Sequence, residues 1–262
     1  MQPGPARPYE TSRVPVRRLP HGTADMDRLA VEEPLEIRVN GTAVAVTMRT
    51  PGHDEELALG FCLSEGIRPL DARPSSDLEA NVVEVDAPGA ELERVQRSFY
   101  TSSSCGVCGK GALEAVAVDA PRIESDLAVP FRVVAALPDL LVAEQATFAL
   151  TGGLHATGLF SVDGELACAR EDVGRHNAMD KVLGWAHREG LLPLSRSILC
   201  VSGRLSFELV QKASVAGCPV VVAVGAPSSL AVDLAADRGL TLCGFVRGGT
   251  ATVYTETDRI VS

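Results

Sequence analysis

The sequence predicts an α/β protein, in which a layered α/β domain follows a smaller N-terminal α+β subdomain. Two patterns carry this prediction. From about residue 197 onward, short apolar runs alternate with segments that start near a serine and end at a glycine, as strands and crossover helices do in a parallel sheet. Before residue 100, apolar residues alternate singly with polar ones, which is typical of antiparallel strands with one solvent face.

The composition fits a globular chain and excludes several classes of protein. The 262 residues are 46% apolar, enough to bury a core, and the net charge of −10 excludes a generally basic nucleic-acid binder. No apolar run approaches the roughly 20 residues of a membrane helix, and the N-terminus lacks the apolar segment of a secretory signal. We therefore expect a cytoplasmic protein without a nucleic-acid or membrane partner.

We expect four parts along the chain. Residues 1–20 are rich in arginine and proline, which predicts a disordered tail. Residues 21–100 are expected to form the small α+β subdomain. Residues 101–125 contain a mobile, glycine- and serine-rich loop and the segment after it. Residues 126–262 predict the ligand-binding α/β domain.

In the first half, three segments predict regular elements. Asn40-Gly41 supplies the tight turn of a hairpin over residues 35–48, because apolar residues alternate on both sides of it. Residues 53–66 have acidic residues in the first turn and end at a glycine, which favours a short helix. Residues 81–85 predict a further strand.

The second half predicts alternating strands and helices. Residues 137–150 favour a helix, Asp163-Gly164 the turn of a hairpin, and residues 175–190 an amphipathic helix. Strands are then expected over residues 197–201, 219–224 and 241–246, with helices over 206–217 and 228–239. Ligands of such sheets usually lie beyond the carboxyl ends of the strands, which here are residues 202–204, 225–228 and 247–249.

The cysteines fall into two groups. Five of the seven stand singly inside apolar stretches, where a thiol behaves as a small hydrophobe: Cys62, Cys168, Cys200, Cys218 and Cys243. Cys105 and Cys108 form the only close pair, in the loop segment YTSSSCGVCGKG. Because thiolates are the reactive form and Lys110 lies nearby, this pair is the sharpest candidate for a nucleophile.

Four interpretations of the pair remain open: a dithiol redox pair, half of a zinc site, a persulfide-bearing sulfur carrier, or two ordinary thiols. Zinc needs two more ligands, and the chain has no second CxxC and no HxxxH, so we expect no metal. The zinc deaminase signature H-x-E places a general acid–base glutamate two residues after a histidine. In this chain Thr157 occupies that position after His155, so the glutamate is missing. A flexible loop favours the carrier, because its sulfur must be loaded at one surface and delivered at another.

Further polar residues could contact a ligand. His155 and His176 lie among glycines and polar residues, and the segment EDVGRHNAMDK around His176 fits either polar recognition or a helix-capping network. Several glycine-rich loops with Arg204 and Arg247 could bind phosphates at helix starts. No Walker or GxGxxG motif is present, which disfavours ordinary ATP hydrolysis and NAD binding.

Six segments in order resemble one family: SSSCGVCGKG, TGGLHATGLF, REDVGRHNAMDKVLG, VSGRLSFELVQKA, AVGAPSSLAVDLA and GFVRGG. From about residue 30 to the end, the chain resembles the formate dehydrogenase accessory sulfurtransferase family, FdhD. The resemblance implies a cytidine deaminase-like layered fold without deaminase activity. It also implies a sulfurtransferase that accepts sulfane sulfur from a cysteine desulfurase. The recipient would be the molybdenum of a bis(molybdopterin guanine dinucleotide) cofactor, before that cofactor enters formate dehydrogenase.

Residue roles follow from the same resemblance. Cys105 would carry the persulfide and Cys108 would assist or resolve it. The cofactor-binding segment would comprise Phe245, Val246, Arg247, Gly248, Gly249 and Thr250, and GDP would serve as a fragment mimic. We also expect a homodimer. The alternatives are a CxxC dithiol redox protein and a molybdenum-cofactor chaperone whose cysteines do no chemistry.

Overall fold

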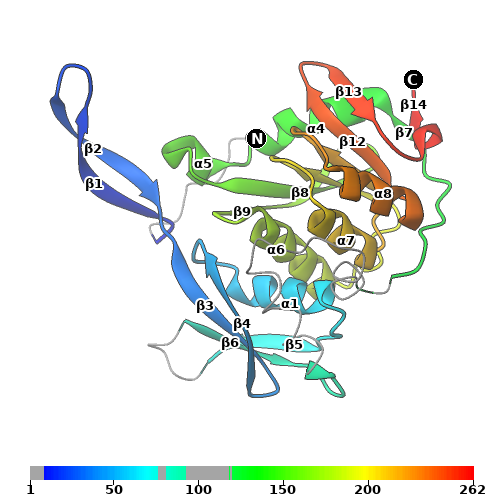
Figure 1. Ribbon diagram of the computed structural model, residues 1–262, viewed down its shortest axis with the longest axis horizontal. Helices are drawn as coiled ribbons and strands as arrows, with labels where there is room; N and C mark the ends of the chain where they lie inside the picture. The colour runs from blue at the N-terminus through cyan, green and yellow to red at the C-terminus, as the bar shows by residue number, and fades with distance from the viewer. Residues whose placement is uncertain (1–8, 76–80, 93–117, 119) are drawn as a thin grey trace.

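The computed structural model describes residues 9–75, 81–92, 118 and 120–262 (Figure 1). The strands are β1 Thr11–Arg18, β2 Thr23–Ala30, β3 Glu33–Val39, β4 Thr42–Arg49, β5 Asp71–Pro74, β6 Val82–Asp86, β7 Val129–Pro130, β8 His155–Ser161, β9 Leu166–Asp172, β10 Ser197–Val201, β11 Val220–Ala223, β12 Thr241–Arg247, β13 Thr250–Val253 and β14 Ile260–Val261. The α-helices are α1 Asp54–Ser64, α4 Phe131–Val142, α5 Ala146–Thr151, α6 Arg175–Arg188, α7 Phe207–Val215 and α8 Ser229–Arg238.

A six-stranded sheet organises the larger part, with the strand order β13-β12-β11-β10-β8-β9. Strands β10, β11 and β12 are parallel, and β8 pairs antiparallel with both β10 and β9. Residues of these strands alternate between two cores: one lies against α4 and the other against α6, α7 and α8 (Figure 1). The α/β prediction is therefore confirmed, while the cytidine deaminase-like layering stays a prediction.

A second, four-stranded sheet, ordered β4-β3-β6-β5, forms the smaller N-terminal part. The hairpin predicted at Asn40-Gly41 joins β3 to β4, and both turn residues have positive φ angles of 51° and 79°. The inner face of this sheet packs on α1, through a core that includes Leu35, Ile37 and Leu57. Helix α1 lies between this sheet and α6, as Figure 1 shows, and so joins the two parts.

The two helices of this junction cross at glycines. A Cβ atom on Gly60 of α1 would overlap the backbone carbonyl of Asp180, and a Cβ on Gly184 of α6 would overlap the carbonyl of Glu56. Glycine inside a helix costs about 1 kcal/mol relative to alanine. Here that cost is offset because only glycine lets the two backbones approach so closely.

Two elements differ from the sequence prediction. The prediction that residues 1–20 are a disordered tail is wrong for Thr11–Arg18. These residues form β1 and pair along their length with β2. The single helix predicted over residues 137–150 is instead two helices, α4 and α5. Helix α4 begins at Phe131, earlier than the predicted residue 137, and Pro138 lies inside the helix.

We expect Gly184→Ala to lower the free energy of unfolding, although alanine is the better helix former. The added methyl group must force α1 and α6 apart, and overpacking of a tight contact typically costs about 1–3 kcal/mol. Urea denaturation measures the loss. Gly153→Ala is the matched control, because its Cβ would meet its nearest neighbour at an ordinary 3.6 Å. Equal stability of Gly184→Ala and wild type would contradict the close crossing.

Candidate functional site at the carboxyl edge of the sheet

Strands β9, β10, β11 and β12 all end at the same edge of the large sheet, because they are mutually parallel. At this edge the backbones of three loops are hydrogen bonded in sequence. The Phe245 amide donates to the Gly225 carbonyl at 3.1 Å, and the Gly225 amide donates to the Gly203 carbonyl at 3.0 Å. A Cβ on Gly225 would lie 2.9 Å from the Gly203 oxygen, so the close approach requires glycine. The result is a continuous edge of half-buried, mutually hydrogen-bonded backbone, which we call the carboxyl edge.

Three helices begin at the carboxyl edge, after the N-cap residues Gly174, Ser206 and Ser228. The first turns of α6, α7 and α8 therefore direct their amide N–H groups and the positive ends of their dipoles toward it. The Ser228 hydroxyl accepts from the Ala231 amide and caps α8. This arrangement favours a negatively charged ligand.

Three cationic or titratable side chains gather at one end of the carboxyl edge. His155 is the first residue of β8, which runs opposite to β10, so it lies beside Gly203. Partial burial lowers the pKa of His155, and the positive charges of Arg175 and His176 lower it further. The structure thus brings together both histidines that the sequence singled out.

His176 has two partners that the sequence did not indicate. Its Nε2 atom lies 2.7 Å from a carboxylate oxygen of Glu208 and 3.2 Å from the hydroxyl of Ser206. The hydrogen bond from His176 lowers the pKa of Glu208. Both partners belong to the start of α7, and an acidic residue in a first helical turn is too common to signal such a pair.

The predicted cofactor-binding segment lies at the other end of the carboxyl edge. Phe245 is 41% exposed and has a φ angle of 53°, a left-handed conformation that is strained for a bulky residue. The ladder between β12 and β13 shifts register here, so that the Phe245 ring turns outward while Val246 is buried. The Arg247 guanidinium lies 6.0 Å from the centre of the Phe245 ring.

A two-residue turn completes this segment. Gly248 and Gly249 have φ angles of 56° and 76°, and nothing lies within 4 Å of the positions of their missing Cβ atoms. The Thr250 hydroxyl donates to the Arg247 carbonyl at 2.9 Å. The turn therefore presents open backbone beside an exposed arginine and an aromatic ring.

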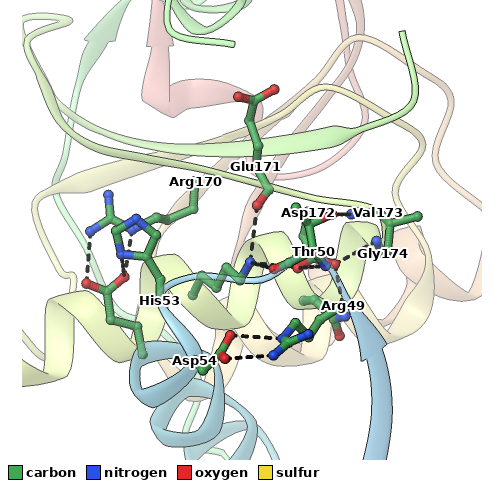
Figure 2. A network of polar contacts seen from close by, with 12 residues as sticks. Arg49, Thr50, His53, Asp54, Arg170, Glu171, Asp172, Val173 and Gly174 are labelled. Atoms are coloured by element: carbon green, nitrogen blue, oxygen red, sulfur yellow. Dashed lines mark hydrogen bonds and ion pairs between the residues drawn. The ribbon is translucent and has the colours of Figure 1, made fainter. Parts of the chain in front are cut away.

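The rest of the EDVGRHNAMDK segment is structural. The Asp172 carboxylate, fully buried, accepts from the Gly174 amide at 2.8 Å and from the Thr50 amide at 3.1 Å, and forms an ion pair of 2.7 Å with Lys181 (Figure 2). Glu171 accepts from two backbone amides at the start of α5, at 2.9 and 2.7 Å. The segment therefore contains two kinds of residue. Arg175 and His176 face the carboxyl edge, whereas Asp172 and Lys181 make buried contacts that hold the layers together.

A second ion pair joins α1 to β9. Arg170 donates two hydrogen bonds to Glu56, at 2.6 and 2.9 Å, and His53 lies 3.2 Å from the same carboxylate (Figure 2). Burial alone would raise the pKa of Glu56. The hydrogen bonds from His53 and Arg170 outweigh it and hold the pKa at about 2.

Cys105 and Cys108 lie outside the described residues. The described chain includes Val118, whose amide donates to the Gln211 side chain on α7 at 3.2 Å and whose side chain lies against Gly66, just after α1. The five single cysteines are buried as predicted. Burial raises the pKa of every one of these thiols, to about 12 at Cys62, Cys168, Cys218 and Cys243.

Among the residues that the structure describes, no helix is long and apolar enough to cross a membrane. Within the same residues, no group of three or more histidine, cysteine, aspartate or glutamate side chains is arranged to hold a metal ion.

Comparison with known proteins identifies the class to which this fold and carboxyl edge belong. A sequence model of the FdhD/NarQ family matches residues 30–261, so the chain belongs to that family. The resemblance drawn from the six segments is confirmed.

Several relatives have a more specific name, sulfur carrier protein FdhD. The relative from Mycobacterium tuberculosis is 51% identical over 274 residues, covering 93% of this chain and 97% of its own. The relative from Streptomyces coelicolor is 52% identical over 270 residues, covering 95% of each chain. A crystal structure of a putative formate dehydrogenase accessory protein from Desulfotalea psychrophila is similar, with a TM-score of 0.74 and 27% identity over 96% of this chain and 98% of that one.

The low pKa of Glu56 predicts a pH-dependent contribution to stability. Its folded pKa of about 2 lies below the ordinary 4.5, so the contribution is fully present above pH 4.5 and is lost as the pH falls through about 2. We expect Glu56→Gln to unfold more easily than wild type at pH 7, by up to about 3 kcal/mol. The difference should shrink between pH 4.5 and 2.

Urea denaturation at a series of pH values measures this difference. Glu165→Gln, which alters an exposed carboxylate in the β8–β9 turn, is the control and should change stability by less than about 0.5 kcal/mol. A Glu56→Gln deficit that is constant with pH would contradict the assigned ion pair.

Proposed function

We propose that the chain is a sulfurtransferase that carries sulfane sulfur as a persulfide on Cys105. The donor is a cysteine desulfurase, and the recipient is the molybdenum of a bis(molybdopterin guanine dinucleotide) cofactor destined for formate dehydrogenase. Membership of the FdhD/NarQ family and the names of the relatives support the sulfur-carrier role. The observation that carries the proposal is the carboxyl edge, which joins an aromatic–arginine end to a histidine–arginine end by glycine backbone.

Loading needs a single reactive thiolate. The Cys105 thiolate attacks the terminal sulfur of the donor's persulfide, a new S–S bond forms, and the donor cysteine leaves as a thiolate. The five buried cysteines do not compete, because their raised pKa values keep them protonated.

The terminal sulfur of the persulfide can be delivered to molybdenum by two routes in which atoms and electrons balance. The routes differ in the role of Cys108. If molybdenum attacks the terminal sulfur, the metal supplies two electrons, the sulfur becomes sulfide, and Cys105 leaves as a thiolate. If Cys108 resolves the persulfide, its thiolate attacks Cys105, sulfide is released to the metal, and a Cys105–Cys108 disulfide remains. The disulfide distinguishes the second route from the first.

The carboxyl edge suits the cofactor in size and charge. From β12 to β8 there are three strand spacings, roughly 14 Å, so a dinucleotide-containing ligand could lie across all four strand ends. Phe245 offers a ring for a guanine, Arg247 and the open turn suit a phosphate, and the α6 end adds Arg175 and His176. Such local cations are needed because the chain as a whole, at −10, repels an anion at long range.

The persulfide is tested by mass spectrometry of the intact protein after incubation with a cysteine desulfurase and cysteine. We expect an increment of one sulfur atom that dithiothreitol removes. The increment should be lost in Cys105→Ser and kept in Cys108→Ser. Labelling of Cys105→Ser at the wild-type level would show that the carrier is misassigned. Absence of label in wild type would favour the chaperone alternative, and a disulfide without added sulfur the redox alternative.

The ligand site is tested by calorimetry with GDP. We expect Arg247→Ala to weaken GDP binding by about 1.5–3 kcal/mol, the range for a hydrogen bond to a charged group, while persulfide loading stays intact. Arg196→Ala is the matched control, because this exposed arginine precedes β10 at the opposite edge of the sheet. Equal GDP affinity of Arg247→Ala and wild type would remove this segment from the site.

A further inference from the structure

His176 is held by two side chains from the start of α7. Its Nε2 atom lies 2.7 Å from a carboxylate oxygen of Glu208 and 3.2 Å from the hydroxyl of Ser206. The lowered pKa of Glu208 keeps this carboxylate ionised, and an ionised carboxylate only accepts hydrogen bonds. Nε2 therefore carries a proton. Nδ1 has no hydrogen-bond partner among the described residues, and it is left for a ligand at the carboxyl edge.

Ser206 serves His176 and not its own helix. It is the N-cap residue of α7, where a serine hydroxyl usually accepts from a backbone amide of the first turn, but its side chain forms no such bond. Ser228, the N-cap residue of α8, does form it. The Glu208 side chain is 51% exposed, and an exposed ion pair contributes little stability. The start of α7 thus orients the His176 ring at little gain in stability.

Charged and titratable groups surround the pair of His176 and Glu208. They are Arg175 on α6, His155 on β8, Asp172 on β9, Lys212 on α7 and Glu65 after α1. Burial lowers the pKa of His155, and the positive charges of Arg175 and His176 lower it further, so the His155 ring is neutral at pH 7. Of the two histidines at this end of the carboxyl edge, His176 is therefore the one suited to donate a proton.

The proposed ligand directs its metal toward these histidines. In a molybdopterin guanine dinucleotide, the guanine and the metal-binding dithiolene lie at opposite ends, with the pyrophosphate between them. With the guanine on Phe245, the metal end points along the carboxyl edge toward the histidine–arginine end, roughly 14 Å away.

The segment that contains both sulfur-carrier cysteines rejoins the described chain at the same helix. Val118 is the first described residue after it, and its amide donates to the side chain of Gln211 at 3.2 Å. Gln211 lies three residues after Glu208 on α7, so the two share one face of the helix. Helix α7 therefore connects the return of the cysteine segment with His176.

We propose that His176, held by Glu208 and Ser206, is the acid of sulfur delivery. It donates a proton to the sulfur atom that takes up the electron pair when the S–S bond of the persulfide breaks. This inference rests on the proposed function and holds for both delivery routes. If molybdenum supplies two electrons, the proton converts the departing Cys105 thiolate into a thiol. If Cys108 resolves the persulfide, the proton lets the terminal sulfur leave as hydrosulfide, which loses the proton again on binding the metal. In either case His176 becomes neutral and regains its proton from solvent.

Single-turnover transfer from the persulfide-loaded chain to the molybdenum cofactor tests the acid. Mass spectrometry of quenched samples follows the loss of the added sulfur atom from about pH 6 to about pH 9. We expect His176→Gln to load like wild type and to deliver sulfur at least about a hundredfold more slowly at pH 6, the lower end of the range for general acid–base catalysis. The ratio of the two rates should shrink at high pH, where the wild-type imidazole is neutral as well.

Two further variants separate proton donation from structural damage. Glu208→Gln keeps a hydrogen-bond acceptor but removes the charge that favours the imidazolium. It should slow delivery by about tenfold and move the pH dependence to lower pH. His187→Gln, which replaces a half-buried histidine in the last turn of α6, is the matched control and should deliver like wild type.

The orientation of the ligand is tested separately by NMR of the histidine rings. GDP should leave the His176 signals in place, whereas the complete molybdenum cofactor should shift them. A shift with GDP alone, or none with the complete cofactor, overturns the orientation and the proposal with it.

The rate outcomes distinguish this inference from the proposed function. A wild-type chain that neither loads nor delivers sulfur contradicts both. A wild-type chain that loads and delivers, beside a His176→Gln variant that delivers at the same rate, overturns only the role of His176. A slower His176→Gln whose deficit is constant with pH also overturns proton donation.

Discussion

The buried carboxylate of Asp172 is the interaction on which the arrangement of layers and site depends. Its two oxygens accept hydrogen bonds from Thr50, Gly174 and Asn177, and its charge is matched by Lys181. Thr50 belongs to the connection between the small sheet and α1, whereas Gly174 is the N-cap of α6. Removing one partner of such a buried pair typically costs about 3–5 kcal/mol, because the other charge is left without compensation.

This carboxylate also positions the histidine–arginine end of the carboxyl edge. Arg175 and His176 are the first residues of α6, so their positions follow from the way Asp172 fixes the start of that helix. The glycine crossing of α1 and α6 acts on the same helix further along its axis. Charged groups that are buried for structural reasons thus determine where the exposed cations of the carboxyl edge can be.

The layers were predictable where a segment has one buried face. Residues 35–48 alternate singly and the helix at α6 repeats its apolar residues every three or four positions, and both elements formed where expected. The β1–β2 ribbon was missed because neither of its faces is buried, so its sequence carries no apolar period. Pairing with β2, and not burial, makes β1 a strand.

The site was predictable in part for a similar reason. Glycine loops at strand ends and the polar contexts of His155 and His176 indicated the carboxyl edge, because chain order alone brings parallel strand ends together. The partner of His176, Glu208, and the burial of Asp172 and Lys181 were not indicated. Charged residues are usually exposed, and a pairing between distant segments leaves no local pattern in the sequence.

The five buried thiols have a consequence for how sulfur is distributed within one chain. With a pKa of about 12, a thiol is ionised in only about one molecule in 10⁵ at pH 7, against a few per cent for an ordinary exposed cysteine. Sulfane sulfur exchanges readily between thiolates, so a carrier with seven equivalent cysteines would scramble its cargo among internal positions from which no acceptor could collect it. In the sulfur-carrier function proposed above, the burial of five thiols would leave only Cys105 and Cys108 to determine how many sulfur atoms one chain carries.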